Sequence, residues 1–346
     1  MKRVLLFALC LIFTASIAFA QNNATVNQTG ADHKATVDQQ GGHVEAVINQ
    51  ADRANTAIIE QVNTSVVAGL AAQATINQAG VGNEARIIQT QDATDRHAGL
   101  ARALIMQDGK NNRARQEQGP HNNLGSVSAT ITQSGNENYA VQTQKVYQSS
   151  ASIAQTGNRN VARQSQLAHS VLSIVQDGSD NTADQIKEAG WGHAVTAVQT
   201  GNRNRSYQNA ASWEGDASVF QNGNDNNARQ EQSGSLNGAV IQQEGNDNLA
   251  RQEQYGAGRG LYPAKNNDAL ISQKGNGNEA IQKQYVDGGA WNAVNIPNSA
   301  QIFQDGANNW AKQDQMAGNN NSVITQLGNG NKATVTQVGG GAPAIF

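Results

Sequence analysis

The sequence is poor in the residues that hold most globular proteins together. Its 346 residues include a single cysteine, Cys10, and aromatic residues make up only 5% of the chain. One cysteine excludes an internal disulfide framework. Apolar residues reach 38%, while Asn, Gln and Gly are abundant, so a conventional hydrophobic core would be thin. Such a composition by itself favours disorder, and only a regular pattern among the polar residues would argue against it.

Charge and long apolar runs are also scarce. Charged residues account for 15% of the chain, and the net charge is −3. No dense run of Lys or Arg and no nucleic-acid-binding motif occurs, which argues against DNA or RNA as a partner. Beyond residue 20 no stretch is apolar enough to cross a bilayer, so we expect no transmembrane segment in the mature chain.

The first 20 residues differ from the rest. Lys2 and Arg3 are followed by an apolar stretch and then by Ala18, Phe19 and Ala20. A basic start, a short apolar run and a small-x-small cleavage site are typical of a secretory signal peptide. We therefore predict a signal peptide at residues 1–20 and a secreted mature chain at residues 21–346. Because Cys10 lies in the removed part, the mature chain is expected to have no cysteine ligands.

What the chain does have is an internal repeat. Two small residues stand 11 positions apart, as Ala129 and Ala140 do, and this pair recurs thirteen times. Every repeat has a glutamine four residues after the first anchor, and twelve have a glycine two residues after that glutamine. The glutamines are Gln28, Gln50, Gln78, Gln107, Gln133, Gln155, Gln176, Gln199, Gln221, Gln243, Gln273, Gln304 and Gln326. The glycines are Gly30, Gly80, Gly109, Gly135, Gly157, Gly178, Gly201, Gly223, Gly245, Gly275, Gly306 and Gly328.

The second arm of each repeat has its own pattern. Twelve repeats carry an asparagine two residues before the second anchor, and eleven end in glutamine four residues after it. The asparagines are Asn55, Asn83, Asn112, Asn138, Asn160, Asn181, Asn204, Asn226, Asn248, Asn278, Asn309 and Asn331. Lys187 and Ala210 replace the terminal glutamine in two repeats. The offset between arms never changes, whereas the spacing from one repeat to the next varies, so we expect insertions on one edge only.

This pattern predicts the fold. Within an arm the special positions alternate, which is typical of a β-strand with one buried face, and the glycine permits a turn. Two short strands are not stable alone, but stacked copies can form two facing parallel sheets. We predict an all-β protein: a β-solenoid of strand–turn–strand repeats (β-arches) of about 22 residues, stacked in about 13 rungs at roughly 4.8 Å per rung. Residues 21–346 would form this one solenoid.

The buried amides need partners. Val or Ile of the first arm would face Ala of the second arm. The recurring first-arm glutamine would lie near the second-arm asparagine. Identical amides stacked rung on rung can donate and accept along the axis, so we expect the glutamines and asparagines to form structural amide ladders. A second-arm inner position is Gln in nine central repeats but Val37, Ile59 and Ile87 at the start and Val335 at the end, which predicts a more apolar core at both ends.

The repeat resembles a known family. The pattern Gln-x4-Asn-x5-Gln, with Gly two after the first Gln and Ala two after the Asn, is similar to the curlin repeat. Gln133, Gly135, Asn138, Ala140 and Gln144 match it position for position. The resemblance implies a secreted bacterial subunit that forms functional amyloid in biofilm matrix. It also implies a curli-type secretion channel, accessory chaperones and a nucleator subunit as partners.

We therefore expect a structural subunit of extracellular, curli-like fibres that assembles with itself end to end by strand addition. Two alternatives from other classes stay open. A monomeric secreted β-solenoid could act as an adhesin or bind ice or carbohydrate, but a regular Thr-x-Thr face, as at Thr130 and Thr132, is missing from most rungs. A solenoid enzyme would need clustered acids and bases, and none is evident. No histidine pair stands at metal-ligand spacing, so we expect no metal, no cofactor and no catalytic residues.

Overall fold

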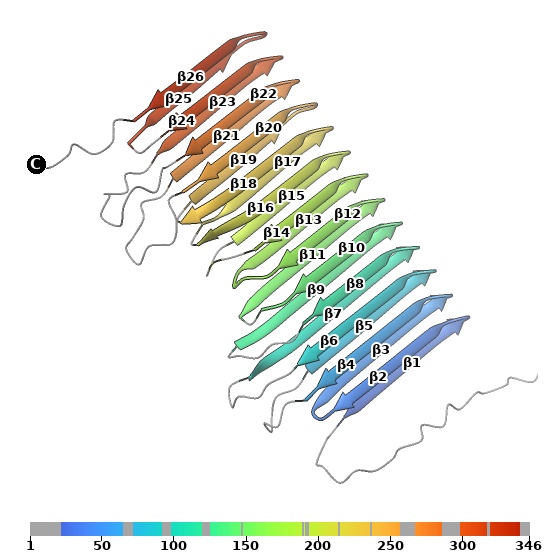
Figure 1. Cartoon of the computed structure of the whole chain (residues 1–346). Coiled ribbons are helices and arrows are strands. Elements are labelled where there is room, and N and C mark those ends of the chain that lie inside the picture. Colours follow the sequence, from blue (N-terminus) through green and yellow to red (C-terminus); the bar gives the residue numbers. More distant parts are fainter. Residues whose placement is uncertain are drawn as a thin grey trace, which may run out of the picture.

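The computed structural model describes residues 22–64, 72–91, 98–119, 125–146, 148–188, 190, 194–213, 215–235, 237–256, 267–285, 298–316 and 319–339. The signal peptide expected at residues 1–20 lies outside these residues. The described part is built from strands that stack into a long, regular array (Figure 1). No helix in it is both long and apolar enough to cross a membrane.

Each repeat contributes two strands. The first arms are β1 (Asn23–Ala31), β3 (Val44–Arg53), β5 (Ala72–Val81), β7 (Ala98–Lys110), β9 (Gly125–Asn136), β11 (Ser149–Asn158), β13 (Val171–Ser179), β15 (Ala194–Asn202), β17 (Ala217–Asn224), β19 (Asn237–Glu244), β21 (Asn267–Asn276), β23 (Ser299–Ala307) and β25 (Asn321–Leu327). The second arms are β2 (Lys34–Gly41), β4 (Thr56–Asn63), β6 (Glu84–Gln91), β8 (Arg113–Gln118), β10 (Tyr139–Gln144), β12 (Val161–Gln166), β14 (Thr182–Lys187), β16 (Arg205–Trp213), β18 (Asn227–Ser235), β20 (Leu249–Tyr255), β22 (Glu279–Tyr285), β24 (Trp310–Met316) and β26 (Lys332–Val338). We number the rungs from 1 (β1 and β2) to 13 (β25 and β26).

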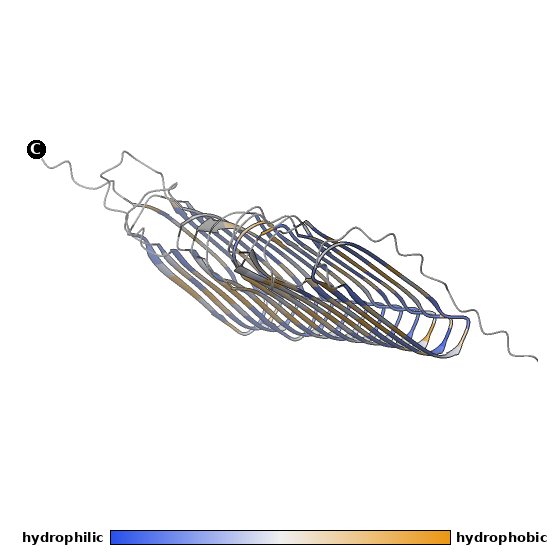
Figure 2. Cartoon of the chain, turned by 90° about the horizontal axis from the view of Figure 1, so that it is seen from below, coloured by the Kyte–Doolittle hydropathy of each residue, from blue (hydrophilic) through white to orange (hydrophobic). Residues whose placement is uncertain are grey.

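All odd-numbered strands form one 13-stranded sheet and all even-numbered strands form another. Every pairing is parallel and sets equivalent repeat positions side by side, as with Gln133 beside Gln155 and Ala140 beside Ala162. One register shift occurs, between β7 and β9 near Ala98. The predicted β-solenoid with two parallel sheets is thus confirmed. Figure 2 shows the two layers of strands facing each other along the stack.

The core lies between the two sheets and is thin. Strand residues alternate between buried and partly exposed, as the period of two requires. Ile131 of the first arm and Ala140 of the second are both fully buried in one continuous cluster. A large residue in one sheet therefore meets a small one in the other, which lets the sheets approach closely.

The two edges of the stack differ. Within a rung the arms are joined by two to four residues, such as Glu137 and Asn138, and Glu137 takes a positive φ of 56°. Between rungs the connection varies from the single residue 236 to the stretch 286–298. The large variation in length therefore lies at the edge between rungs, and the other edge keeps short connections throughout.

The turn glycines are fixed by the neighbouring rung. Gly157 has a φ of +104°, and a Cβ atom placed on it would lie 2.0 Å from the carbonyl oxygen of Gly178. No side chain fits so close to a backbone atom, and the positive φ adds strain for any other residue. Rung 2 has Asp52 here instead, with a φ of 72°, and its carboxylate accepts a hydrogen bond from the Gly80 N–H at 2.7 Å.

Candidate functional site

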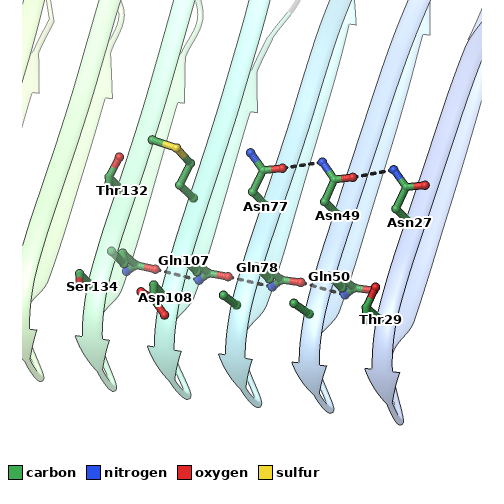
Figure 3. A pocket seen from close by; sticks show the side chains of 14 residues that line it. Asn27, Thr29, Asn49, Gln50, Asn77, Gln78, Gln107, Asp108, Thr132 and Ser134 are labelled. Carbon is green, nitrogen blue, oxygen red and sulfur yellow. Dashed lines mark hydrogen bonds between the residues drawn. The ribbon is translucent and has the colours of Figure 1, made fainter.

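The first-arm glutamines form an unbroken ladder through the whole stack. Each Nε2 donates to the Oε1 of the equivalent glutamine in the next rung, from Gln28 to Gln326, at 2.7–2.9 Å. Figure 3 shows this row at Gln50, Gln78 and Gln107. The buried amides thereby satisfy one another, and satisfied amides can occupy a core without a free-energy penalty.

The direction of this ladder is fixed by a second bond. The other Nε2 hydrogen donates to a backbone carbonyl in the facing arm, as from Gln133 to the Arg113 oxygen at 3.1 Å. If the amide were reversed, its oxygen would face that carbonyl oxygen. Every glutamine in this row therefore donates toward higher residue numbers, so the row has a donor end and an acceptor end.

Two further glutamine rows run through the second arms, in addition to the predicted ladders of first-arm glutamines and second-arm asparagines. One joins the nine glutamines from Gln116 to Gln313 at 2.8–2.9 Å. The other joins the terminal glutamines from Gln39 to Gln166 and from Gln232 to Gln337 at 2.7–3.0 Å. The signal for both rows was present as periodic glutamine in the second arm.

The asparagines bond differently from the expected amide ladder. From Asn83 onward, the backbone N–H of each asparagine donates to the Oδ1 of the asparagine in the preceding rung at 2.9–3.1 Å, and that of Asn55 donates to the His33 ring at 3.3 Å. The Nδ2 of Asn138 donates to the turn carbonyl of Gly157 at 2.9 Å, and the other interior rungs repeat this bond. Only from Asn226 onward does Nδ2 also donate to the preceding Oδ1. The asparagines therefore tie each turn to the next rung.

Rungs 7 and 8 interrupt the terminal glutamine row. Lys187 and Ala210 stand where the row would continue, and both are fully buried. Burial lowers the pKa of Lys187 to about 8, although the charge of Asp216 acts to raise it. Lys187 is therefore expected to lose its proton in the mildly alkaline range rather than above pH 10.

The core changes at the same place. Ala197 stands in rung 8 where most rungs have Ile or Val, and Leu172 and Val195 stand where most have Ala. One apolar cluster ends at Ala197 and the next begins at Val219, with a smaller cluster between them. We call β13 to β16 the irregular segment.

The two end rungs leave ladder atoms at the ends of the stack. Gln28 and Gln39 direct their Nε2 toward rung 2, so their Oε1 atoms lie on the outer side of rung 1. At the opposite end, Gln326 and Gln337 donate to backbone carbonyls only, as far as the described residues show. Both sheets thus have an edge strand with its ladder unfinished.

Exposed charges pair along the stack. Arg159 donates two hydrogen bonds to Asp180 at 2.7 and 2.8 Å, and Arg203 binds Asp225 in the same way. These hydrogen bonds lower the pKa of both aspartates. Within the described ranges no group of three or more His, Cys, Asp and Glu residues could hold a metal ion. These charged side chains therefore form solvent-exposed pairs on the surface.

This geometry of stacked arches with glutamine ladders can be compared with known proteins. Residues 298–339 match the family model of the curlin associated repeat. The matched stretch covers β23 to β26, which are rungs 12 and 13. The curlin repeat therefore occurs at the C-terminal end of this solenoid, and the other rungs share its glutamine ladder and turn. No curated protein matches the chain.

Proposed function

We propose that this chain is a structural subunit of extracellular, curli-like fibres that elongate end to end by strand addition. The curlin repeat at residues 298–339 and the solenoid fold support the class of protein. The observation that carries the proposal is that the two end rungs are complementary. In a fibre, β25 and β26 of one copy would lie beside β1 and β2 of the next copy in the register that every rung already uses.

The polar ladders fit only one orientation. With rung 13 set on rung 1, the free Nε2 hydrogen of Gln326 would point at the Oε1 of Gln28, and Gln337 would point at Gln39. A head-to-head contact would instead oppose acceptors to acceptors. The ladder direction therefore favours head-to-tail growth, and the ordering of each new copy would extend two glutamine rows at once.

The apolar positions fit in the same way. Within the chain, Val335 pairs with Gln313 and stands apart from the other apolar residues at this position. Across a head-to-tail junction it would lie beside Val37, followed by Ile59 and Ile87. Val26, which is 45% exposed at the end of the stack, would be covered by Ile324. The more apolar core at both ends is thereby joined into one patch at the junction.

The turn leaves room for the next copy. A Cβ placed on Gly328 would meet nothing within 4 Å, whereas the equivalent position in interior rungs is occupied by a neighbouring carbonyl. The carbonyl of Gly30 from the next copy would fill this space. The same turn would then repeat across the junction without adjustment.

The proposal includes the setting of the fibre. A signal peptide at residues 1–20, a curli-type secretion channel, accessory chaperones and a nucleator subunit would bring the chain to the cell surface. There the fibre would contribute to biofilm matrix, adhesion and aggregation. The role needs no cofactor, metal, catalytic residue or nucleic acid.

The test compares the same substitution on the inner and on the outer side of β26. Val335→Lys places a charge on the inner side of β26, where it reaches solvent in a single copy but is buried in a junction. Thr334→Lys places the same charge on the outer side of the same strand. Chains of residues 21–346 are released from denaturant and followed by thioflavin T fluorescence, electron microscopy and fibre diffraction.

We expect wild type and Thr334→Lys to form fibres with reflections near ~4.8 and ~10 Å. Val335→Lys should remain folded but lengthen at least tenfold more slowly. If both variants elongate like wild type, or if wild type stays monomeric with a β-rich spectrum, end-to-end assembly is wrong.

A further inference from the structure

The two outer faces of the solenoid carry very different charge. Consider the outward positions one and three residues after each anchor, which give 26 positions per sheet. In the even-numbered sheet 14 of these are charged. In the odd-numbered sheet none is charged. They are Thr25, Asn27, Val47, Asn49, Thr75, Asn77, Leu104, Met106, Thr130, Thr132, Ser152, Ala154, Ser173, Val175, Thr196, Val198, Ser218, Phe220, Val240, Gln242, Leu270, Ser272, Gln301, Phe303, Val323 and Thr325. We call these residues the neutral face.

The neutral face is solvent-accessible along the stack. None of its side chains is buried, and Val175, Phe220 and Val323 are 39%, 40% and 55% exposed. The charged face, by contrast, is held by ion pairs such as Arg86–Glu60 at 2.9 Å and Lys283–Glu253 at 2.9 Å. Charges on an exposed sheet limit sideways contact. The two central rows of the odd-numbered sheet lack them, while the outward rows on either side carry charges such as Glu45, Arg102, Asp108 and Lys274.

We propose that the neutral face is a self-association surface, through which a second copy of this chain packs side by side with the first. The two central rows of one copy can meet those of another without burying a charge of their own, and burial of an unpaired charge would cost several kcal/mol per ion. At ~4.8 Å per rung and ~3.3 Å per residue, a strip about four residues wide along rungs 1 to 10 covers about 630 Å², so a pair would remove about 1,300 Å² from water. Specific interfaces bury roughly 1,200–2,000 Å², so this area lies at the lower end of the range for a stable pair.

The shape of the neutral face favours a second copy of this chain as its partner. Near rungs 1 to 5 a groove of about 450 Å³ runs along the axis, lined by Asn49, Ala51, Asn77 and Ala79 among others. Asp108 of rung 4 also lines the groove and is its one carboxylate. Figure 3 shows its rim, where Asn27, Asn49 and Asn77 are joined by hydrogen bonds of 2.8 Å. The groove arises because small side chains lie next to this asparagine row.

A ridge on the same face complements that groove. Val175, Val198 and Phe220 occupy the row that begins with Asn27, in three successive rungs, 7 to 9. A two-fold axis across the face would set rung 8 of each copy against rung 3 of the other. Each ridge would then lie over the partner's groove, which is the self-complementarity that an isologous contact requires. The extension from pairs of chains to bundles of fibres rests on the proposed end-to-end assembly.

The test places the same charges on either face. Thr130→Lys with Ser152→Lys adds two lysines to the neutral face in rungs 5 and 6. Thr143→Lys with Ser165→Lys makes the same two changes in the same rungs on the charged face. A third variant, Val198→Ser with Phe220→Ser, removes the ridge without adding charge. Circular dichroism checks that each variant is folded, thioflavin T follows elongation, and electron microscopy counts single and bundled fibres.

We expect all variants to elongate at similar rates. Bundling should fall at least tenfold in the neutral-face lysine variant, several-fold in the ridge variant, and not in the charged-face variant. Equal bundling in all variants, or equal loss in both lysine variants, overturns the proposal. If no fibres form, the proposed end-to-end assembly is wrong. Sedimentation then measures whether two single copies still pair through the neutral face. Dimers of wild type but not of the neutral-face variant would still support the inference, and monomers throughout would overturn it.

Discussion

Rungs 5 and 6 and the irregular segment of rungs 7 and 8 are adjacent and share one backbone geometry. In rungs 5 and 6 all three glutamine rows are present, whereas in rungs 7 and 8 Lys187 and Ala210 break one of them. The first-arm glutamines, the turn glycines and the asparagines persist in both regions. The parallel pairing also continues through the break without a shift in register. The comparison indicates that the turn and the first-arm ladder are required, while the terminal row tolerates interruption.

The largest expected effect concerns a feature that both regions share. Gly157→Ala in rung 6 and Gly178→Ala in rung 7 would each place a Cβ within about 2.0 Å of the next carbonyl oxygen. Strain at positive φ and the clash together should cost about 4 kcal/mol in either region. Urea unfolding in the Val335→Lys background, which keeps the chain monomeric, measures this. A Gly178→Ala variant as stable as its parent would show that the irregular segment has lost the requirement.

The next effect is specific to the irregular segment and depends on pH. Lys187 loses its proton at about pH 8 in the folded chain but near 10.5 when unfolded. Between these values the unfolded state binds the extra proton, so stability should rise with pH by on the order of 3 kcal/mol. Lys187→Gln should remove this rise and raise stability at pH 7. Thermal unfolding between pH 7 and 10.5 tests it, and identical pH profiles for parent and variant would refute a buried lysine.

The smallest effect compares an intact ladder position with a broken one. Gln144 accepts from Gln118 at 3.0 Å and donates to Gln166 at 2.9 Å. Gln144→Leu would leave both neighbours without their partner, at a cost of about 2 kcal/mol. Ala210→Gln adds an amide beside Gln232 but meets Lys187 on its other side, so it should gain less than about 1 kcal/mol. If Gln144→Leu lowered the free energy of unfolding by as much as Ala210→Gln raised it, the terminal glutamine row could continue through the irregular segment without cost.

Most of the fold could be predicted because the repeat fixes it locally. The 11-residue offset set the arms, the period of two set the buried face, and the glycine marked the turn. Pairs such as Ile131 and Ala140 were expected to face each other and lie in one buried cluster. Each of these features depends only on neighbouring residues and on the stacking of like on like.

The hydrogen bonds of the asparagines could not be predicted in the same way. The direction of the turn carbonyls decides whether Asn138 meets another amide or Gly157, and that direction follows from backbone angles such as φ of Glu137. Lys187 was noted as an exception to the glutamine rule, but its burial depends on neighbouring rungs. The neutral face becomes apparent in the sequence once the strands are assigned to two sheets.

The backbone hydrogen bonds between rungs all point along the long axis of the stack. A pull along that axis therefore loads the contacts between rungs in series. In such an arrangement every contact bears the full force, while the extension is shared among all of them. The stiffness of the stack then depends on all of its contacts, whereas the force that breaks it is set by the weakest contact. A filament of these subunits would yield where only two glutamine rows cross a contact, as in the irregular segment, between rungs 3 and 4, and at the joints between copies.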